Sequence, residues 1–278
     1  AEYYRKYFGV DRSGNFGLSW TFDIEGGARR FASFFANPLE LAAATLLTGA
    51  VLVAMFIKNK IEEPRLFQAA LLFSIVCVVF ALSRASLAGY FMASYLFFLI
   101  NGNKKILWIY HGLFVLVAIG FIYFLANGII GEFILNTFTF TNTSSLSHLV
   151  EWVDGIEAIG RSPMGLGLGE SGRVAGELGL NVGGENQIII IGVQSGIVAI
   201  GLYVLMYAVT IGWSVKLFLK GDGKEQQLGI MLFILKIGMI VPVLTASVES
   251  YLYISAMGWF LVGLMSTTYA SYRKRQRD

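Results

Sequence analysis

The chain has 278 residues, of which 56% are hydrophobic and only 14% are charged, and its mean hydropathy is +0.66. Soluble domains carry roughly a quarter charged residues, so this composition excludes an ordinary soluble domain and predicts an integral membrane protein. The net charge of +3 and the pI near 8.9 indicate no nucleic-acid partner, because the basic residues are distributed among loops instead of forming one face.

The residues that usually bind metals are sparse and isolated. The one cysteine, Cys77, lies in an apolar run, and the two histidines, His111 and His148, have no metal-ligand spacing such as HExxH. The sequence also contains no paired acidic motif for a nucleotide-sugar metal, no Walker motif and no GxSxG motif. We therefore expect no metal site and no bound cofactor.

Residues 1–37 are polar and aromatic and contain no apolar run long enough to span a bilayer. Arg29 and Arg30 precede an aromatic cluster of the kind found at membrane interfaces. We interpret residues 1–37 as an extracytoplasmic or interfacial arm, in which Arg29 or Arg30 could bind an anionic ligand. The polar start carries no signal peptide, so we expect upstream sequence that delivers it across the membrane.

Apolar segments follow at about seven places, each near the roughly 20 residues that a helix needs to cross the hydrocarbon core, with about 17 tolerated. Four lie in residues 38–126 and three in residues 187–278. The seven are Leu39–Ile57, Leu66–Leu82, Ser86–Ile100, Ile106–Ala126, Gln187–Leu219, Leu228–Leu244 and Tyr251–Tyr269. The fifth is either one long helix or a helix kinked near Gly192–Gly196. We therefore predict an all-α polytopic membrane helix bundle.

Lysines and arginines near the ends of these segments set the orientation. If the spans alternate, eleven basic residues fall on one side, which the positive-inside rule assigns to the cytoplasm. They are Lys58, Lys60, Arg65, Lys104, Lys105, Lys216, Lys220, Lys224, Arg273, Lys274 and Arg275. Residues 1–37, Arg84, Glu249 and the long loop at residues 127–186 then face outward, and the C-terminal tail is cytoplasmic.

The loop at residues 127–186 contains a segment with helical spacing. Its apolar residues Leu149, Trp152, Val153 and Ile156 would share one face, which predicts a short amphipathic helix lying on the membrane surface. His148 belongs to the same segment and is a candidate substrate contact.

The glycine-rich stretch Arg161–Gly196 runs directly into an apolar segment. Glycine lets the backbone approach a ligand closely and adopt positive φ, so Gly165, Gly167 and Gly169 could cradle an anion or a sugar. A dinucleotide fingerprint is excluded, because that motif needs a preceding strand and a following helix in a βαβ unit. The charged residues beside these glycines are Arg161, Glu170 and Arg173.

Two further positions combine polar groups with a membrane boundary. Arg84 interrupts two apolar runs within ALSRASLAG, where a guanidinium could bind phosphate in a bidentate manner or merely extend to the headgroups. Glu185 and Asn186 stand where the long loop meets the span from Gln187, and Asn186 is a candidate substrate contact. Glu185 could act as a general base, orient a hydroxyl, or only favour the helix N-terminus electrostatically.

Together, and in this order, these segments resemble the O-antigen ligase and O-antigen polymerase (Wzy) family of bacterial envelope glycosyltransferases. The resemblance rests on SRAS after a span, on W-x-x-G-x-x-x-I-x-x-S-P-x-G-x-G-x-G in the long loop, and on GGENQ before an apolar helix that contains Gly196. Upstream, RRFASFFANPLELAA is similar to the family's R-x-x-G-x-F-x-N-P-N-x-x-A segment, from which Ala32 and Leu39 depart.

The resemblance implies a metal-independent, membrane-embedded transferase of the GT-C type. Such enzymes move a glycan from an undecaprenyl-diphosphate carrier to an acceptor at the outer face of the cytoplasmic membrane. Arg84, with Arg161 or Arg173, would bind the lipid diphosphate, and Glu185 would orient or deprotonate the acceptor hydroxyl. The ligases carry a histidine where this chain has Glu185, so the resemblance favours a polymerase-type member. A chain-length regulator or a flippase is an expected partner.

Three alternatives stay open. An oligosaccharyltransferase-like enzyme is indicated by Glu151–Gly155, although Val153 interrupts the two adjacent aromatics that this class needs. A transporter of lipid-linked glycans without chemistry would be favoured by interrupted helices and inverted repeats, and the sequence shows no internal repeat. An inert scaffold would leave the outward arginines and Glu185 unexplained.

Overall fold

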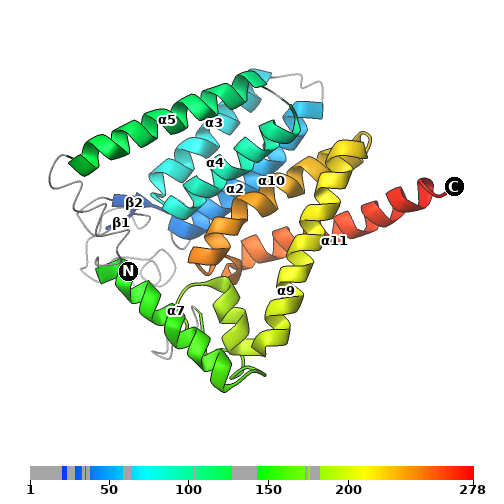
Figure 1. Ribbon diagram of the computed structural model, residues 1–278. Coiled ribbons are helices and arrows are strands. Elements are labelled where there is room, and N and C mark those ends of the chain that lie inside the picture. Colours follow the sequence, from blue (N-terminus) through cyan, green and yellow to red (C-terminus); the bar gives the residue numbers. More distant parts are fainter. Residues whose placement is uncertain are drawn as a thin grey trace, which may run out of the picture. The chain divides into compact units, whose positions relative to one another are not determined.

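The computed structural model describes residues 21–23, 29–32, 35, 38–58, 64–102, 104–126, 143–172, 175 and 182–278. The chain divides into two compact units, one made of Ala1–Ala93 with Val204–Asp278 and the other of Ser94–Tyr203. The described residues form eight α-helices, one short 3₁₀ helix and two short strands (Figure 1). The helical class expected from the sequence is therefore confirmed, with one short strand pair added.

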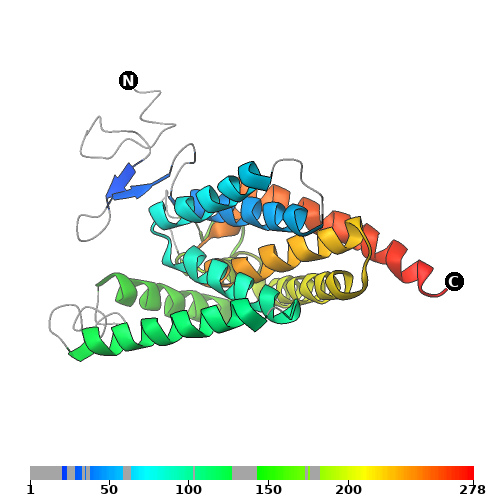
Figure 2. The ribbon, with the colours of Figure 1, turned by 90° about the horizontal axis from the view of Figure 1, so that it is seen from above.

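That strand pair lies in the predicted arm. β1 (Thr21–Asp23) runs antiparallel to β2 (Arg29–Phe31), with Asp23 opposite Arg29 (Figure 2). No strand was expected here, because three residues are too few to show the alternation that marks a strand. Apart from Ala32 and Phe35, the rest of the arm lies outside the described residues.

The first unit is built on α2 and α10. α2 packs against both α3 and α10, and α11 contacts α2 and α10 in turn (Figures 1 and 2). The elements of this unit are α2 (Pro38–Lys58), α3 (Pro64–Phe80), the first part of α4 (Arg84–Ile100), the second part of α9 (Gln187–Lys220), α10 (Lys224–Thr245), η1 (Val248–Ser250) and α11 (Leu252–Arg275).

Small residues and a buried hydroxyl hold these helices together. Gly89 on α4 faces the carbonyl oxygen of Gly238 on α10, and a Cβ at Gly89 would overlap that oxygen. Tyr90 on α4 donates its hydroxyl to the carbonyl oxygen of Thr45 on α2 at 2.8 Å. Close approach at small residues is the usual way in which membrane helices pack, since lipid tails are as apolar as the side chains between helices.

The second unit contains the remaining parts of α4 and α9, together with α5 (Lys104–Ala126) and α7 (Thr143–Arg161). α4 and α5 are joined where Tyr110 donates its hydroxyl to Ser94 Oγ at 2.5 Å. Elsewhere on α5, Trp108 is 76% exposed and Phe114 is 73% exposed. Large exposed apolar surfaces of this kind mark contact with lipid or with another protein.

α7 is the amphipathic helix expected from the spacing of its apolar residues. Val153 and Ile156 are exposed on it, whereas Gly155 is buried. The predicted helix is therefore confirmed, and the described structure adds which of its faces packs inward.

Among the described residues, three helical segments are long and apolar enough to cross a membrane, namely Pro38–Met55 within α2, Gln187–Lys220 and Lys224–Thr245. Three further apolar helices, Gln68–Phe80, Arg84–Ile100 and Leu107–Gly120, are shorter. This pattern is that of a multi-pass membrane protein. α11, the seventh expected span, is not among the long apolar candidates, and its last turns read STTYASYRKR. The number of spans beyond three stays a prediction.

Candidate functional site

The long apolar helix α9 is broken shortly after it begins. Gly196 has φ 84° and ψ 179°, a backbone conformation that is essentially restricted to glycine. The helix changes direction at this point, where its lime and yellow parts meet in Figure 1. Of the two forms expected from the sequence, the kinked one is confirmed.

The glycine-rich loop after α7 satisfies backbone groups that the break releases. Three main-chain hydrogen bonds join the loop to the two sides of the break, from Leu166 N to Val193 O (2.7 Å), from Gly167 N to Gln194 O (3.2 Å) and from Ile197 N to Pro163 O (2.9 Å). Broken helices in membranes are tolerated only where other parts of the protein provide such partners. The loop therefore takes the place of a missing helical turn.

Two glycines make this docking possible. A Cβ on Gly165 would lie 2.5 Å from the carbonyl oxygen of Gln194, and a Cβ on Gly196 would overlap the carbonyl oxygen of Pro163. Both glycines also have positive φ, 90° and 84° respectively. The SPMG segment and Gly196, which are far apart in sequence, thus form one contact.

The other two candidate glycines of the loop, Gly167 and Gly169, have open space beside the position of a Cβ. Gly167 and Gly169 have φ of 117° and 93°, and a Cβ on either would meet no atom within 4 Å. The next residues are tied down: Gln194 Nε2 donates to Ser171 O at 2.7 Å, and Glu170 O accepts from Val182 N at 3.4 Å. Of the predicted cradle, Gly165 therefore serves packing and Gly167 donates its N–H to Gln194 O, while the space beside Gly169 stays accessible to a ligand.

α7 packs closely on the turn that precedes α9. A Cβ on Gly155 would lie 2.6 Å from Gly183 Cα, and a Cβ on Gly184 would overlap Glu151 Oε2. The same Glu151 oxygen lies 3.4 Å from His148 Nδ1. The helix thereby brings a histidine and a carboxylate to the turn that carries Glu185.

Unpaired polar atoms gather in this part of the chain. Among the described residues, Trp152 Nε1 and Gln187 Oε1 are buried without a hydrogen-bond partner, and Glu151 Oε2 has only the imidazole contact. Gln187 is 8% exposed, and buried polar atoms are almost always hydrogen-bonded. These atoms could form hydrogen bonds with the hydroxyls of a sugar. Glu151 and Gln187 were not candidates from the sequence, because only folding shows that their oxygens are buried.

Glu185 and Asn186 play different parts at the start of α9. Asn186 caps the helix, since its Oδ1 accepts from Ile188 N at 3.0 Å and from Ile189 N at 3.3 Å. Glu185 is exposed in the preceding turn, where its carboxylate is accessible to an acceptor. The predicted contact of Asn186 with substrate stays a prediction.

Arg161 ends α7 and pairs with Glu157 on the same helix, with Nη2 2.5 Å from Oε1. Exposed pairs of this kind stabilise a protein by only about 0.2–1 kcal/mol, so the guanidinium is easily released to a stronger anion. Arg173, the other loop arginine predicted to bind diphosphate, lies outside the described residues.

Arg84 is the exposed first residue of α4. The neighbouring serines cap the N-terminus of α4. Ser83 Oγ accepts a hydrogen bond from Ser86 N at 3.3 Å and donates one to Ser86 Oγ at 3.0 Å. Arg84 belongs to the first unit, whereas Arg161 and Glu185 belong to the second. Their predicted convergence on one cavity therefore stays a prediction.

Arg29 and Arg30, the candidate anion ligands of the arm, both lie in β2. Arg29 stands opposite Asp23 in the strand pair, and Arg30 stands opposite Phe22. A role in binding an anion stays a prediction for both.

A buried ion pair in the first unit was not expected from the sequence. Lys236 on α10 is 3% exposed, and its Nζ lies 3.6 Å from Glu249 Oε1 in η1. The ammonium also lies 4.6 Å from the ring centroid of Tyr207 and 4.3 Å from that of Trp259. The signal was available, because a lysine inside the apolar run Leu228–Leu244 is a functional candidate by default. The predicted membrane orientation depends only on basic residues near the span ends, so it assigns no role to Lys236.

In the described part of the chain, no three His, Cys, Asp or Glu side chains gather as metal ligands. Comparison of the chain with protein-family models, with curated proteins and with solved structures finds no match. Function must therefore be inferred from the chain's own residues and geometry.

Proposed function

We propose that the protein is a membrane glycosyltransferase that polymerises or ligates glycan units delivered on undecaprenyl diphosphate. In this proposal a GT-C-type bundle of about seven spans crosses the bacterial cytoplasmic membrane and the site faces outward. The observation that carries it is the start of α9, where α7 brings His148 and Glu151 to the turn of Glu185. The break at Gly196, filled by the glycine loop, lies about 14 Å further along the same helix. The sequence resemblance to the O-antigen ligase and polymerase family supports the chemistry.

The reaction would exchange one bond at the anomeric carbon. An acceptor hydroxyl forms the new glycosidic bond while the bond to the diphosphate breaks, and undecaprenyl diphosphate departs. Arg84, with Arg161 or Arg173, would stabilise the negative charge that grows on the leaving diphosphate. The weak pairing of Arg161 with Glu157 favours this role, since little stability is lost when a diphosphate displaces the carboxylate.

The acceptor would bind beside the turn before α9. Glu185 would take the proton of the attacking hydroxyl, and the buried atoms of Glu151, Trp152 and Gln187 would bind neighbouring hydroxyls. Gly169 leaves space beside the backbone for a sugar or a phosphate oxygen. Attack on the face opposite the diphosphate would invert the anomeric configuration.

A second candidate is a transporter of lipid-linked glycans without chemistry. The discontinuous helix α9 and the buried Lys236–Glu249 pair both favour it, since transporters use broken helices and intramembrane charges at their substrate sites. No internal repeat, which would strengthen this candidate, is evident in the sequence.

Reconstitution separates the two candidates. The purified protein in liposomes is given undecaprenyl-diphosphate-linked repeat units, and released undecaprenyl diphosphate and elongated glycan are measured by mass spectrometry. We expect both products from the wild type, losses of at least about 100-fold for Glu185→Gln, and normal activity for the tail control Arg277→Ala. Movement of the intact lipid-linked unit across the bilayer without bond cleavage would reject the transferase in favour of the transporter.

A further inference from the structure

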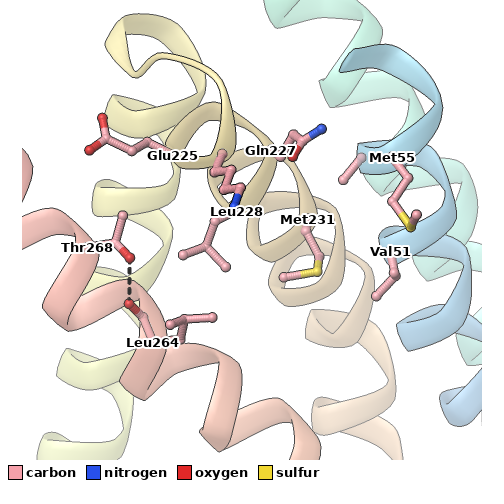
Figure 3. A pocket seen from close by; sticks show the side chains of 10 residues that line it. Val51, Met55, Glu225, Gln227, Leu228, Met231, Leu264 and Thr268 are labelled. Carbon is pink, nitrogen blue, oxygen red and sulfur yellow. Dashed lines mark hydrogen bonds between the residues drawn. The ribbon is translucent and has the colours of Figure 1, made fainter. Parts of the chain in front are cut away.

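α2, α10 and α11 enclose a pocket of about 380 Å³ in the first unit. This volume lies within the roughly 300–1,000 Å³ typical of ligand sites. Figure 3 shows Leu228 and Met231 of α10 between α2, which carries Val51 and Met55, and α11, which carries Leu264. The lining residues are Val51, Ala54, Met55, Lys224, Glu225, Gln227, Leu228, Met231, Leu264 and Thr268.

The pocket is apolar along its length and charged at one end. Its charged residues, Lys224 and Glu225, belong to the first turn of α10. Thr268 donates its hydroxyl to the carbonyl oxygen of Leu264 at 2.8 Å, the dashed line in Figure 3, so this donor is already satisfied. From Lys224 to Met231 the pocket extends about 10 Å along α10, at about 1.5 Å per residue.

The charged end of the pocket is positive. Glu225 is paired with Arg275 of α11, which leaves the exposed Lys224 to set the charge of the mouth. The neighbouring residues 216–225 and 269–278 hold seven basic side chains and three acidic ones. The positive-inside rule assigns this end to the cytoplasmic surface.

The surroundings of the pocket decide which molecule fills it. Met55 is 46% exposed and Leu264 is 45% exposed, so the apolar wall opens toward the lipid. Basic pockets between membrane helices on the cytoplasmic side attract anionic headgroups, and an apolar channel about 10 Å long accepts part of an acyl chain. We propose that this pocket binds one anionic phospholipid, with an acyl chain between α2, α10 and α11 and its phosphate on Lys224. The proposal rests on membrane insertion and not on glycan transfer.

Native mass spectrometry tests the proposal directly. The delipidated protein is titrated with phosphatidylglycerol and, separately, with the zwitterionic phosphatidylcholine, and retained lipids are counted. We expect one phosphatidylglycerol to be retained more tightly than the rest. Lys224→Gln should reduce the preference for phosphatidylglycerol about fivefold, the effect of one basic residue at an anionic surface. Lys105→Gln, an exposed basic control on α5 in the second unit, should change it little.

A second pair of variants tests the acyl-chain part. Leu264→Trp places a large ring in the pocket, at a half-exposed position that tolerates the change, and should abolish retention of the tight lipid. Leu252→Trp, at an 83% exposed position on the same helix, should leave it intact. Equal retention of the two lipids by the wild type, or tight binding that persists in Leu264→Trp, would overturn the proposal. Lipid-free dimers that vanish in Leu264→Trp would identify a second copy as the occupant and overturn it equally.

Discussion

Removal of one partner from the buried Lys236–Glu249 pair should destabilise the protein strongly. Glu249→Gln leaves the ammonium 3% exposed between the rings of Tyr207 and Trp259, without a carboxylate to neutralise it. Breaking a buried pair from one side costs about 3–5 kcal/mol, and the two aromatic faces retain about 0.5–2 kcal/mol of attraction for the cation. We therefore expect Glu249→Gln to lower the free energy of unfolding by about 3 kcal/mol, the lower limit of that range.

The double variant Lys236→Met with Glu249→Leu distinguishes a missing partner from lost packing. It removes both charges, and replacing a buried ion pair by apolar residues of similar size is often neutral or stabilising. Thermal unfolding in detergent should show a melting temperature for Glu249→Gln that is about 6–12 °C below that of the wild type. This follows from a shift of about 2–4 °C per kcal/mol of lost stability for a chain of this size. The double variant should unfold close to the wild type. A Glu249→Gln protein that unfolds at the wild-type temperature, or a double variant that unfolds at a lower temperature than Glu249→Gln, would refute the reasoning.

Three further outcomes are expected. Gly196→Ala should destabilise the broken helix by about 1–3 kcal/mol, because its φ is positive and a Cβ would overlap the docked loop, whereas Gly201→Ala, with open space around it, should unfold like the wild type. Glu151→Gln should raise the KM for the acceptor glycan while the affinity for the lipid-linked donor is retained; a selective loss of donor affinity would contradict this assignment. Arg84→Ala and Glu185→Gln should each abolish chain elongation in cells at normal expression and insertion, and polymers of wild-type length would discard both assignments.

Local pattern was enough to predict the helical elements but not their partners. Val153 and Ile156 show the spacing of one helical face, and the predicted amphipathic helix is present as α7. The sequence also offered a kink near Gly192–Gly196 as one of two forms of α9, and the kinked form is present. Its partner at Pro163–Gly167 could not be predicted, because main-chain hydrogen bonds between distant segments leave no side-chain pattern in the sequence.

Charged residues were harder to assign than apolar ones. Arg161 could be identified as a basic residue at the loop, but not as the partner of Glu157, although their spacing of four residues permits it. The sequence shows Lys236 within an apolar run, but its partner Glu249 lies beyond the end of the same helix. Pairing across a turn depends on tertiary packing, which single-sequence patterns do not encode.

The proposed mechanism requires the outward arginines to converge on the carboxylate at the start of α9. Because Cys77 is the one cysteine, a Cys77→Ser background allows paired cysteines at Arg84 and Glu185 to be cross-linked with a short bis-maleimide in native membranes. The control pair is Arg84→Cys with Lys274→Cys. The predicted orientation places these two positions on opposite sides of the membrane. We expect efficient cross-linking of positions 84 and 185 and none of the control. An absence of cross-linking between 84 and 185, with each cysteine still labelled from outside, would contradict the account.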